Sequence, residues 1–304
     1  MPAPDPDHAV VVDSLEMRYG TKTAVDGLSL TVARGSVTAV LGPNGAGKTT
    51  TLETCEGYRR PQRGTVRVLG LDPQADRRAL LPRIGVMLQE GGAWSGVRAE
   101  EMLRHAASLH ADPLPHGLLV ERLGLAACGR TPYRRLSGGQ KQRLALAMAI
   151  VGRPELVFVD EPTAGMDPQA RRDTWDLLRE LRADGVTVVL TTHYMDEAEV
   201  LCDRVAVMDS GRVLQVGSPA ELVRHLDAPA RILVAPGQLD EAGARGIAGT
   251  ESVEVGPDGT VLTTRHPADV VARLGELGAL DGVRVQTGTL EDVFLALTGR
   301  SYRA

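Results

Sequence analysis

Cysteine is scarce in this chain of 304 residues, and its positions argue against a zinc site. The 3 cysteines are Cys55, Cys128 and Cys202, which lie far apart and lack the paired spacing that zinc ligands show. We interpret them as buried or inert thiols of a protein that stays in a reducing compartment.

Long apolar runs and an excess of positive charge are also missing. No apolar run approaches the roughly 18 residues that are needed to span a bilayer. Residues 1–12 lack a basic flank followed by an apolar core, so we expect no signal peptide and a cytoplasmic protein. The net charge of −5 argues against a nucleic-acid-binding surface as the main function.

Lysine is the third scarce residue, because it occurs only at Lys22, Lys48 and Lys141 while arginine supplies nearly all other positive charge. Arg-favouring codon usage accounts for this bias. Lys48 nevertheless holds the lysine position of a G-x-x-x-x-G-K-[ST] pattern, where a compact ammonium fits between phosphates better than a planar guanidinium. The pattern and the residue after it are Gly42, Pro43, Asn44, Gly45, Ala46, Gly47, Lys48, Thr49 and Thr50.

The surroundings of this glycine-rich pattern predict a phosphate-binding loop. Residues 37–41 form an apolar run typical of a strand, and residues 48–56 are typical of a helix, so the glycines lie between the two. Backbone N–H groups of residues 44–49 can surround a β-phosphate, and Lys48 can reach the β- and γ-phosphates. The Thr49 hydroxyl can ligate Mg²⁺. We therefore expect ATP and Mg²⁺ to bind here.

A second anion-binding pattern follows further along the chain. Its two glycines let backbone N–H groups approach a ligand closely, and a serine hydroxyl adds a donor. A helix-forming run follows directly, and the start of a helix favours negative charge. A chain with two separate anion sites is suited to ATP held between two subunits. The residues of this pattern are Leu136, Ser137, Gly138, Gly139 and Gln140.

Two acids end an apolar run at residues 156–161. A buried strand that ends in carboxylates places them at the ligand crevice of an α/β sheet. Asp160 can hold the Mg²⁺ shell, and Glu161 can orient and polarise a water molecule for in-line attack on the γ-phosphate. The alternative is an acidic turn at the end of a strand, which the preceding phosphate loop disfavours.

Three further residues are assigned by their positions beside these motifs. His193 follows the apolar run 186–190, and we expect it near the γ-phosphate rather than in a structural role. Gln89 ends a predicted strand over 84–88, where its amide can contact Mg²⁺. Tyr19 precedes the phosphate loop and can stack on adenine, although a half-buried strand aromatic is the alternative.

The order of predicted elements divides the chain into an α/β part and a smaller α+β part. The first two-thirds alternate β-branched runs with helical patterns, which is typical of an α/β fold. Residues 98–111 and 116–125 predict helices that are more independent of the sheet. Beyond residues 227–229 the predicted order is βαββαβ, which fits a ferredoxin-like module. A final helix is predicted over 290–297.

With these residues placed, the chain resembles the ATP-binding subunit of an ABC transporter over about residues 8–227. Residues 42–49 resemble its Walker A motif, and residues 136–140 its signature. Residues 156–161 resemble Walker B, with Glu161 as the catalytic glutamate. The resemblance implies an α/β ABC-type P-loop nucleotide-binding domain with a helical subdomain at about 95–152. Residues 228–304 then form an accessory or regulatory module.

The same resemblance implies roles for single residues. Gln89 matches the Q-loop, His193 the switch histidine and Tyr19 the aromatic residue of the A-loop. Residues 164–167 are a variant of the D-loop that keeps its aspartate, Asp167. It further implies a homodimer in which each ATP lies between Lys48 and Thr49 of one copy and Ser137 and Gly139 of the other.

Similarity at residues 194–199 and 290–299 extends to the daunorubicin-resistance type of drug exporter subunits. These pair with a separately encoded membrane permease. The resemblance therefore implies export of a drug-like or lipid-like compound by a protein held at the inner face of the membrane. The permease would contact residues 89–94, where Trp94 is either an interface anchor or an ordinary buried loop residue.

Three other functions remain open at the level of the sequence. An importer subunit carries the same ATPase motifs. Soluble ABC ATPases of translation or DNA repair usually contain two nucleotide domains or long coiled coils, and this chain has one set of motifs and no sustained heptads. A regulatory module that binds ATP without hydrolysing it is disfavoured by Glu161 and His193.

Overall fold

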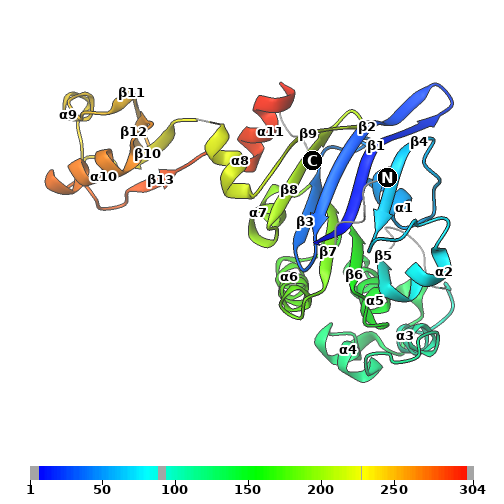
Figure 1. Ribbon diagram of the computed structural model, residues 1–304. Coiled ribbons are helices and arrows are strands. Elements are labelled where there is room, and N and C mark those ends of the chain that lie inside the picture. The colour runs from blue at the N-terminus through cyan, green and yellow to red at the C-terminus, as the bar shows by residue number, and fades with distance from the viewer. Residues whose placement is uncertain (1–6, 88–93, 227, 300–304) are drawn as a thin grey trace. The chain divides into compact units, whose positions relative to one another are not determined.

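The computed structural model describes residues 7–87, 94–226 and 228–299. Contacts within the chain divide it into two compact units, one that ends at Pro219 and one that spans Ala220–Arg303. Each unit has its own layers of helices and strands (Figure 1). Among the described residues, no helix has both the length and the apolar composition needed to cross a bilayer.

A mostly parallel sheet forms the centre of the first unit, with strand order β5-β6-β7-β3-β8-β9. The first five strands in this order pair in parallel, and β9 returns antiparallel to β8 as a hairpin. Every residue of three central strands is buried, as expected for strands covered on both faces. The strands are β3 (Val37–Leu41), β5 (Ile84–Met87), β6 (Leu156–Asp160), β7 (Thr187–Thr192), β8 (Arg204–Asp209) and β9 (Arg212–Gly217).

An antiparallel sheet of three strands packs beside the parallel one, in the order β2-β1-β4. Its strands are β1 (His8–Tyr19), β2 (Lys22–Ala33) and β4 (Arg63–Val68). A single apolar cluster joins this sheet to the parallel sheet, and it includes Leu15 and Val32 from the first and Phe158 from the second. Short apolar runs at residues 10–12 and 28–32 predict strands within β1 and β2 that are shorter than those observed, and no such run predicts β4.

The helices of the first unit fall into two groups. One group is interleaved with the parallel strands: α1 (Lys48–Cys55), α5 (Gly138–Ile150), α6 (Pro168–Ala183) and α7 (Met195–Leu201). The other contains α3 (Ala99–Ser108) and α4 (His116–Arg122), which contact each other and lie apart from both sheets (Figure 1). These are the two independent helices that the sequence predicts. The short α2 (Arg77–Leu80) precedes β5.

The second unit contains the predicted βαββαβ order. Its four strands form one antiparallel sheet in the order β11-β12-β10-β13, which is the arrangement of a ferredoxin-like module. One apolar cluster, with Ile232, Leu262 and Leu274 fully buried, forms its core. The elements are α8 (Pro219–His225), β10 (Ala230–Val234), α9 (Glu241–Arg245), β11 (Thr250–Gly256), β12 (Gly259–Thr264), α10 (Pro267–Glu276), β13 (Arg284–Gln286) and α11 (Leu290–Thr298).

Gly85 of β5 marks the closest approach between the parallel sheet and α5. A Cβ at this position would lie 2.0 Å from the carbonyl oxygen of Ala149, which belongs to helix backbone and cannot rotate away. We expect Gly85→Ala to lower the free energy of unfolding by about 1–3 kcal/mol through overpacking. Urea denaturation measures the change.

Gly117→Ala is the matched control for this substitution. Gly117 lies in α4, and a Cβ there would meet nothing within 4 Å. Alanine is the better helix former by up to about 1 kcal/mol, so this variant should be as stable as the wild type or more stable. If Gly85→Ala unfolds at the same urea concentration as the wild type, β5 and α5 do not approach each other as closely at Gly85 as the structure shows.

Candidate functional site

The carboxyl ends of β3, β6 and β7 meet at one edge of the parallel sheet. Val40 of β3 and Asp160 of β6 both pair with Thr191 of β7, so three distant segments reach the same level. The loop after β3, the acid after β6 and the histidine after β7 therefore converge there. Ligands of open α/β sheets bind at this kind of edge.

The loop between β3 and α1 passes close to neighbouring backbone at two of its glycines. A Cβ on Gly42 would lie 2.2 Å from the carbonyl oxygen of Met208, and one on Gly47 would lie 2.3 Å from that of Ala24. Gly47 also has φ of 103°, a conformation that side chains strain. These two positions require glycine, because any larger residue would push the loop away from the site.

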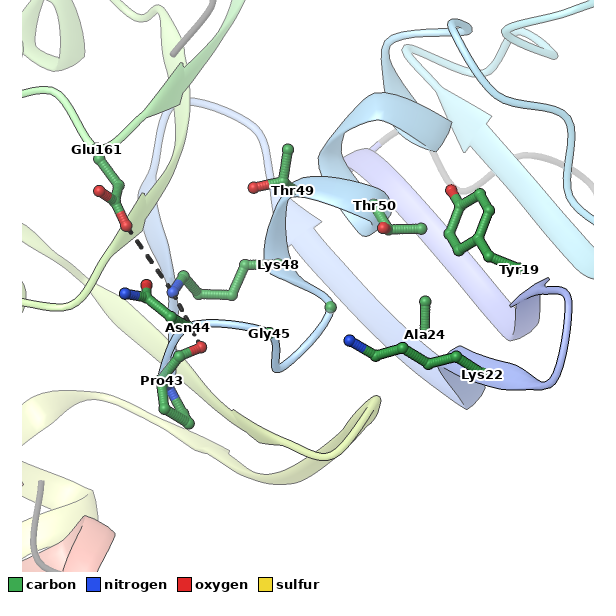
Figure 2. Close-up of a pocket in the computed structure, with 11 residues that line it drawn as sticks. Tyr19, Lys22, Ala24, Pro43, Asn44, Gly45, Lys48, Thr49, Thr50 and Glu161 are labelled. Atoms are coloured by element: carbon green, nitrogen blue, oxygen red, sulfur yellow. Dashed lines mark hydrogen bonds and ion pairs between the residues drawn. The ribbon is translucent and has the colours of Figure 1, made fainter. Parts of the chain in front are cut away.

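Lys48, the first residue of α1, folds back over this loop (Figure 2). Its ammonium donates to the carbonyl oxygens of Gly42 at 2.7 Å and Pro43 at 3.3 Å, and it lies 3.9 Å from Glu161 Oε1. The residue is only 5% exposed. Burial lowers the pKa of the ammonium, and the Glu161 and Asp160 carboxylates act against that shift. The buried positive charge is thus held by oxygen atoms that a phosphate can replace.

Asp160 forms a short polar chain with two threonine hydroxyls. Thr49 Oγ1 donates to Asp160 Oδ2 at 3.2 Å, and the Thr191 hydroxyl donates to Asp160 Oδ1. Burial raises the pKa of the Asp160 carboxyl, while the hydrogen bonds from Thr191 and Thr49 act against the shift. A hydroxyl and a carboxylate side by side are the hard oxygen ligands that Mg²⁺ prefers, so these residues fit that ion.

Glu161 follows Asp160 with an unusual backbone. Its φ is 49°, and its N–H is directed at both the carbonyl oxygen and the hydroxyl of Thr191, each at 3.1 Å. Glu161 Oε1 lies 3.1 Å from His193 Nδ1. This contact lacks the alignment of a hydrogen bond, and the buried Nδ1 has no other hydrogen-bond partner among the described residues. Carboxylate and imidazole are thus side by side.

A cleft of about 310 Å³ lies over the loop. Most of the predicted cofactor-binding residues line it together with Glu161, and they come from β1, the loop, α1 and the end of β6 (Figure 2). Lys22 and Ala24 of β2 also line it, and sequence reasoning missed both. Lys22 follows Tyr19 across a tight turn, which was the signal available. The lining residues are Tyr19, Lys22, Ala24, Pro43, Asn44, Gly45, Gly47, Lys48, Thr49, Thr50 and Glu161.

Tyr19 lies at one end of this cleft and is 42% exposed. The guanidinium carbon of Arg59 lies 5.2 Å from the centre of its ring, and Arg59 in turn is ion-paired with Glu53. The ring is therefore held from one side by a cation. An exposed aromatic side chain beside a phosphate loop is suited to stacking on a base.

Residues 137–140 lie away from the cleft and begin α5. Ser137 caps this helix: its hydroxyl accepts a hydrogen bond from Gln140 N at 3.2 Å, and Gln140 Oε1 accepts one from Ser137 N at 3.0 Å. Among the described lining residues of the cleft, none comes from this segment. A Cβ on Gly138 would meet nothing within 4 Å, so the start of α5 is open to a ligand from outside.

Asp167 has a structural role that its sequence motif did not reveal. It caps α6, where its Oδ1 accepts from Ala170 N at 2.9 Å and from Gln169 N at 3.0 Å. These backbone hydrogen bonds lower the pKa of its carboxyl. The described lining of the cleft does not include it.

The predicted permease-contact segment is described only at its end. Gln89, and with it residues 90–93, lies outside the described residues. Trp94 is 61% exposed, and its ring centre is 5.2 Å from that of His105 in α3. The indole is therefore not an ordinary buried loop residue.

Comparison with known proteins agrees with this geometry. Residues 25–164 match the family described as ABC transporter. The chain is 40% identical to a daunorubicin resistance ATP-binding protein of Streptomyces coeruleorubidus over 98% of both chains. It is 38% identical to a Nod factor export ATP-binding protein of Ralstonia nicotianae over 96% of this chain and 94% of that one.

Solved structures give the same fold. The structure of an ATP-binding subunit of an ABC transporter superposes with a TM-score of 0.65 and 26% identity, covering 71% of this chain and 92% of that one. A dimeric ATP-binding cassette bound to ADP and Pi superposes with a TM-score of 0.63 and 23% identity, covering 69% and 98%. The second likeness concerns the fold alone.

Glu56, at the end of α1, is a buried carboxyl that sequence reasoning missed, and it predicts a pH-dependent stability. Burial raises its pKa from 4.5 to about 8, and the Asp160 and Glu53 carboxylates add to the shift. Between these two pKa values the folded state keeps the proton that the unfolded state has lost. The contribution to stability is therefore full below pH 4.5 and falls steadily until the pH reaches about 8. The free energy of unfolding of Glu56→Gln should therefore increasingly exceed that of the wild type from pH 5 to pH 8.

Urea denaturation at a series of pH values measures this difference. Glu121→Gln, which changes an exposed carboxyl of α4, is the control and should show no such trend. A difference between Glu56→Gln and the wild type that stays constant with pH would contradict the assignment.

Proposed function

Because this chain belongs to the ABC transporter family as an ATP-hydrolysing subunit, we propose that it powers a separately encoded permease that exports a drug-like or lipid-like compound. Two relatives that match nearly the full chain carry out daunorubicin resistance and Nod factor export, as their names state. The observation that carries the proposal is that Lys48 and Glu161 line one cleft, where Asp160 is hydrogen-bonded to the lining residue Thr49 and His193 lies beside Glu161.

ATP would lie along this cleft with its base near Tyr19 and its phosphates over the loop. The donors are the backbone N–H groups of residues 44–49 and the Lys48 ammonium. Lys48 would exchange its contacts with the Gly42 and Pro43 carbonyl oxygens for phosphate oxygens, which bear more negative charge. Thr49, Asp160 and Gln89 would hold Mg²⁺, which neutralises phosphate charge when bound.

Glu161 is the group best placed to act on an attacking water. Its carboxylate borders the cleft 3.9 Å from Lys48 Nζ. It therefore lies beside the position expected for the γ-phosphate, within reach of an attacking water. His193 is next to the same carboxylate oxygen and would contact the γ-phosphate from the end of β7. Both side chains are largely shielded from solvent, with 12% and 19% exposed, which strengthens their electrostatic effect.

A second copy of the chain would complete each site. The start of α5, with Ser137 and Gly139, is not part of the described lining of the cleft in its own copy, yet it has the form of an anion site. A head-to-tail homodimer brings it to the ATP of the partner. ATP then closes the dimer because it binds the closed form more tightly than the open one, and hydrolysis releases it. Asp167, at the start of α6, would lie at this interface.

The remaining assignments concern the organisation of the complex. Residues 8–227 would form the nucleotide-binding domain, and residues 228–304 would stabilise the dimer or regulate turnover. The protein would be peripheral at the inner face of the membrane, held there by the permease. The exposed Trp94 and the helices after it form the surface that we assign to this contact.

Glu161→Gln tests the catalytic assignment. The amide keeps the size of the side chain but cannot accept a proton from water, so kcat for ATP hydrolysis should fall by about 100-fold or more while ATP still binds and closes the dimer. Steady-state hydrolysis and size-exclusion chromatography with ATP measure the two properties. Glu155→Gln, at the other end of β6, is the control and should keep normal turnover. Full activity of Glu161→Gln would remove Glu161 from its role.

Ser137→Arg tests the composite site. The bulky cation would block the ATP of the partner while leaving the cleft of its own copy intact, so ATP should bind but hydrolysis and dimerisation should both be lost. Ser108→Arg, at an exposed serine that ends α3, controls for added charge and size. A Ser137→Arg monomer that hydrolyses ATP at the normal rate would exclude a site shared between copies.

A further inference from the structure

Glu197 is a carboxyl group at the centre of the first unit that the ATP site does not use. It belongs to α7 and is 0% exposed, and the described lining of the cleft does not include it. Burying an acid costs free energy unless hydrogen bonds compensate for the lost water. Burial raises the pKa of this carboxyl, and the hydrogen bonds that it accepts act against that shift. A buried acid outside the cleft is therefore expected to have a role that an apolar side chain of the same size could not fill.

Two donors from different segments meet on one oxygen of this carboxyl. Thr163 Oγ1 donates to Glu197 Oε1 at 2.8 Å, and Trp175 Nε1 donates to the same atom at 3.1 Å. Thr163 is fully buried in the segment between β6 and α6, and Trp175 belongs to α6. The carboxyl therefore joins α7 to α6 and to the connection that follows the catalytic strand.

The positions of these residues in the chain close a ring around the catalytic pair. Thr163 comes two residues after Glu161, and Glu197 comes four residues after His193. Glu161 Oε1 and His193 Nδ1 face each other at 3.1 Å. A closed path of backbone and contacts runs from Glu161 to Thr163, across the hydrogen bond to Glu197, back along α7 to His193 and across to Glu161. The Thr163 hydrogen bond closes this path, while the hydrogen bonds of Thr191 with Asp160 and with the N–H of Glu161 join the same two segments nearer to β7.

Other contacts hold Glu161 and His193 in place within this closed path. The N–H of Glu161 is fastened to Thr191 on one side. On the other side the ring of Tyr194 lies 4.1 Å from that of His193, and the Arg171 guanidinium lies 4.6 Å from the Tyr194 ring. Arg171 Nη1 also contacts Asp196 in the first turn of α7 at 3.3 Å. Within this set of contacts, the Thr163–Glu197 hydrogen bond is the one that joins the segment after Glu161 directly to α7.

We propose that Glu197 is a positioning residue that sets His193 against Glu161 by holding Thr163. It touches neither ATP nor the reacting atoms. Its acceptor oxygen fixes the distance between the segment after Glu161 and the helix after His193. The inference rests on the roles proposed above for Glu161 and His193, because it concerns their mutual geometry. A displacement of about 1 Å in such a pair can cost about 100-fold in rate.

Thr163→Val and Thr163→Ser form a matched pair that separates this link from packing. Valine keeps the shape of threonine but removes the hydroxyl donor, whereas serine keeps the donor and loses a buried methyl group. In the full chain, we expect Thr163→Val to lower kcat for ATP hydrolysis by about tenfold or more with little change in KM. Thr163→Ser should keep kcat near the wild-type value.

Changes at Glu197 and Trp175 complete the test. Glu197→Gln retains an oxygen that can accept from Thr163, so it should restore most of the activity that Glu197→Leu loses. Trp175→Phe removes the indole donor while leaving the Thr163 link in place, so it should lower Tm and leave kcat largely unchanged. Thermal unfolding gives the Tm of every variant. Comparison of Tm with kcat then shows whether activity and stability change together.

Two results would overturn the proposal. One is a Thr163→Val variant with wild-type kcat. The other is a loss of kcat that follows the loss of stability equally in Thr163→Val, Thr163→Ser and Trp175→Phe, because Glu197 would then be purely structural. Glu161→Gln, measured alongside, distinguishes these failures from a failure of the catalytic assignment. If Glu161→Gln stays active, the catalytic role assigned to Glu161 is wrong. If Glu161→Gln is inactive but Thr163→Val has normal kcat, only the positioning role of Glu197 is rejected.

Discussion

The parallel register of β3, β6 and β7 is the constraint on which the site depends. Thr191 pairs with Val40 on one side and with Asp160 on the other, so its backbone and hydroxyl lie between the phosphate loop and the two acids. The hydroxyl donates to Asp160, and both the hydroxyl and the carbonyl oxygen accept from the N–H of Glu161. One threonine therefore orients the expected metal ligand and the expected base. A shift of one residue in this pairing would separate them.

Around this edge, charged groups are buried in advance of any ligand. Lys48 is surrounded by carbonyl oxygens and the Glu161 carboxylate, and Asp160 by two hydroxyls. Glu197, farther from the cleft, is buried on hydrogen bonds from Thr163 and Trp175. Lys48 would still have to exchange its carbonyl contacts for phosphate oxygens, but the acids and hydroxyls are already oriented, and such preorganisation is where much of the electrostatic advantage of enzymes originates. Hydrogen bonds within the same few segments offset part of the cost of burying them, while Glu197 Oε2 has no hydrogen-bond partner among the described residues.

Sequence reasoning succeeded where one local pattern decided the structure. The apolar runs of β3, β6 and β7 predict strands buried on both faces, and the βαββαβ order predicts the antiparallel sheet of the second unit. It failed for β4, because half of that strand is exposed and its polar residues resemble a loop. It also missed the long helix α6, although Asp167 and Pro168 mark its start. The predicted role of Gln89 lies outside the described residues.

The sequence by itself determined the chemistry of this protein, because glycines, a lysine, hydroxyls and acids at short fixed spacings specify a phosphate loop and its metal ligand in any compatible fold. Only the tertiary structure decided which of these groups meet. Thr49 and Asp160 are 111 positions apart, and Thr163 and Glu197 are 34 apart, yet each pair is joined by a hydrogen bond. No local periodicity records such contacts, since they follow from the order and register of strands. The same order leaves Ser137 outside the described lining of the cleft of its own chain.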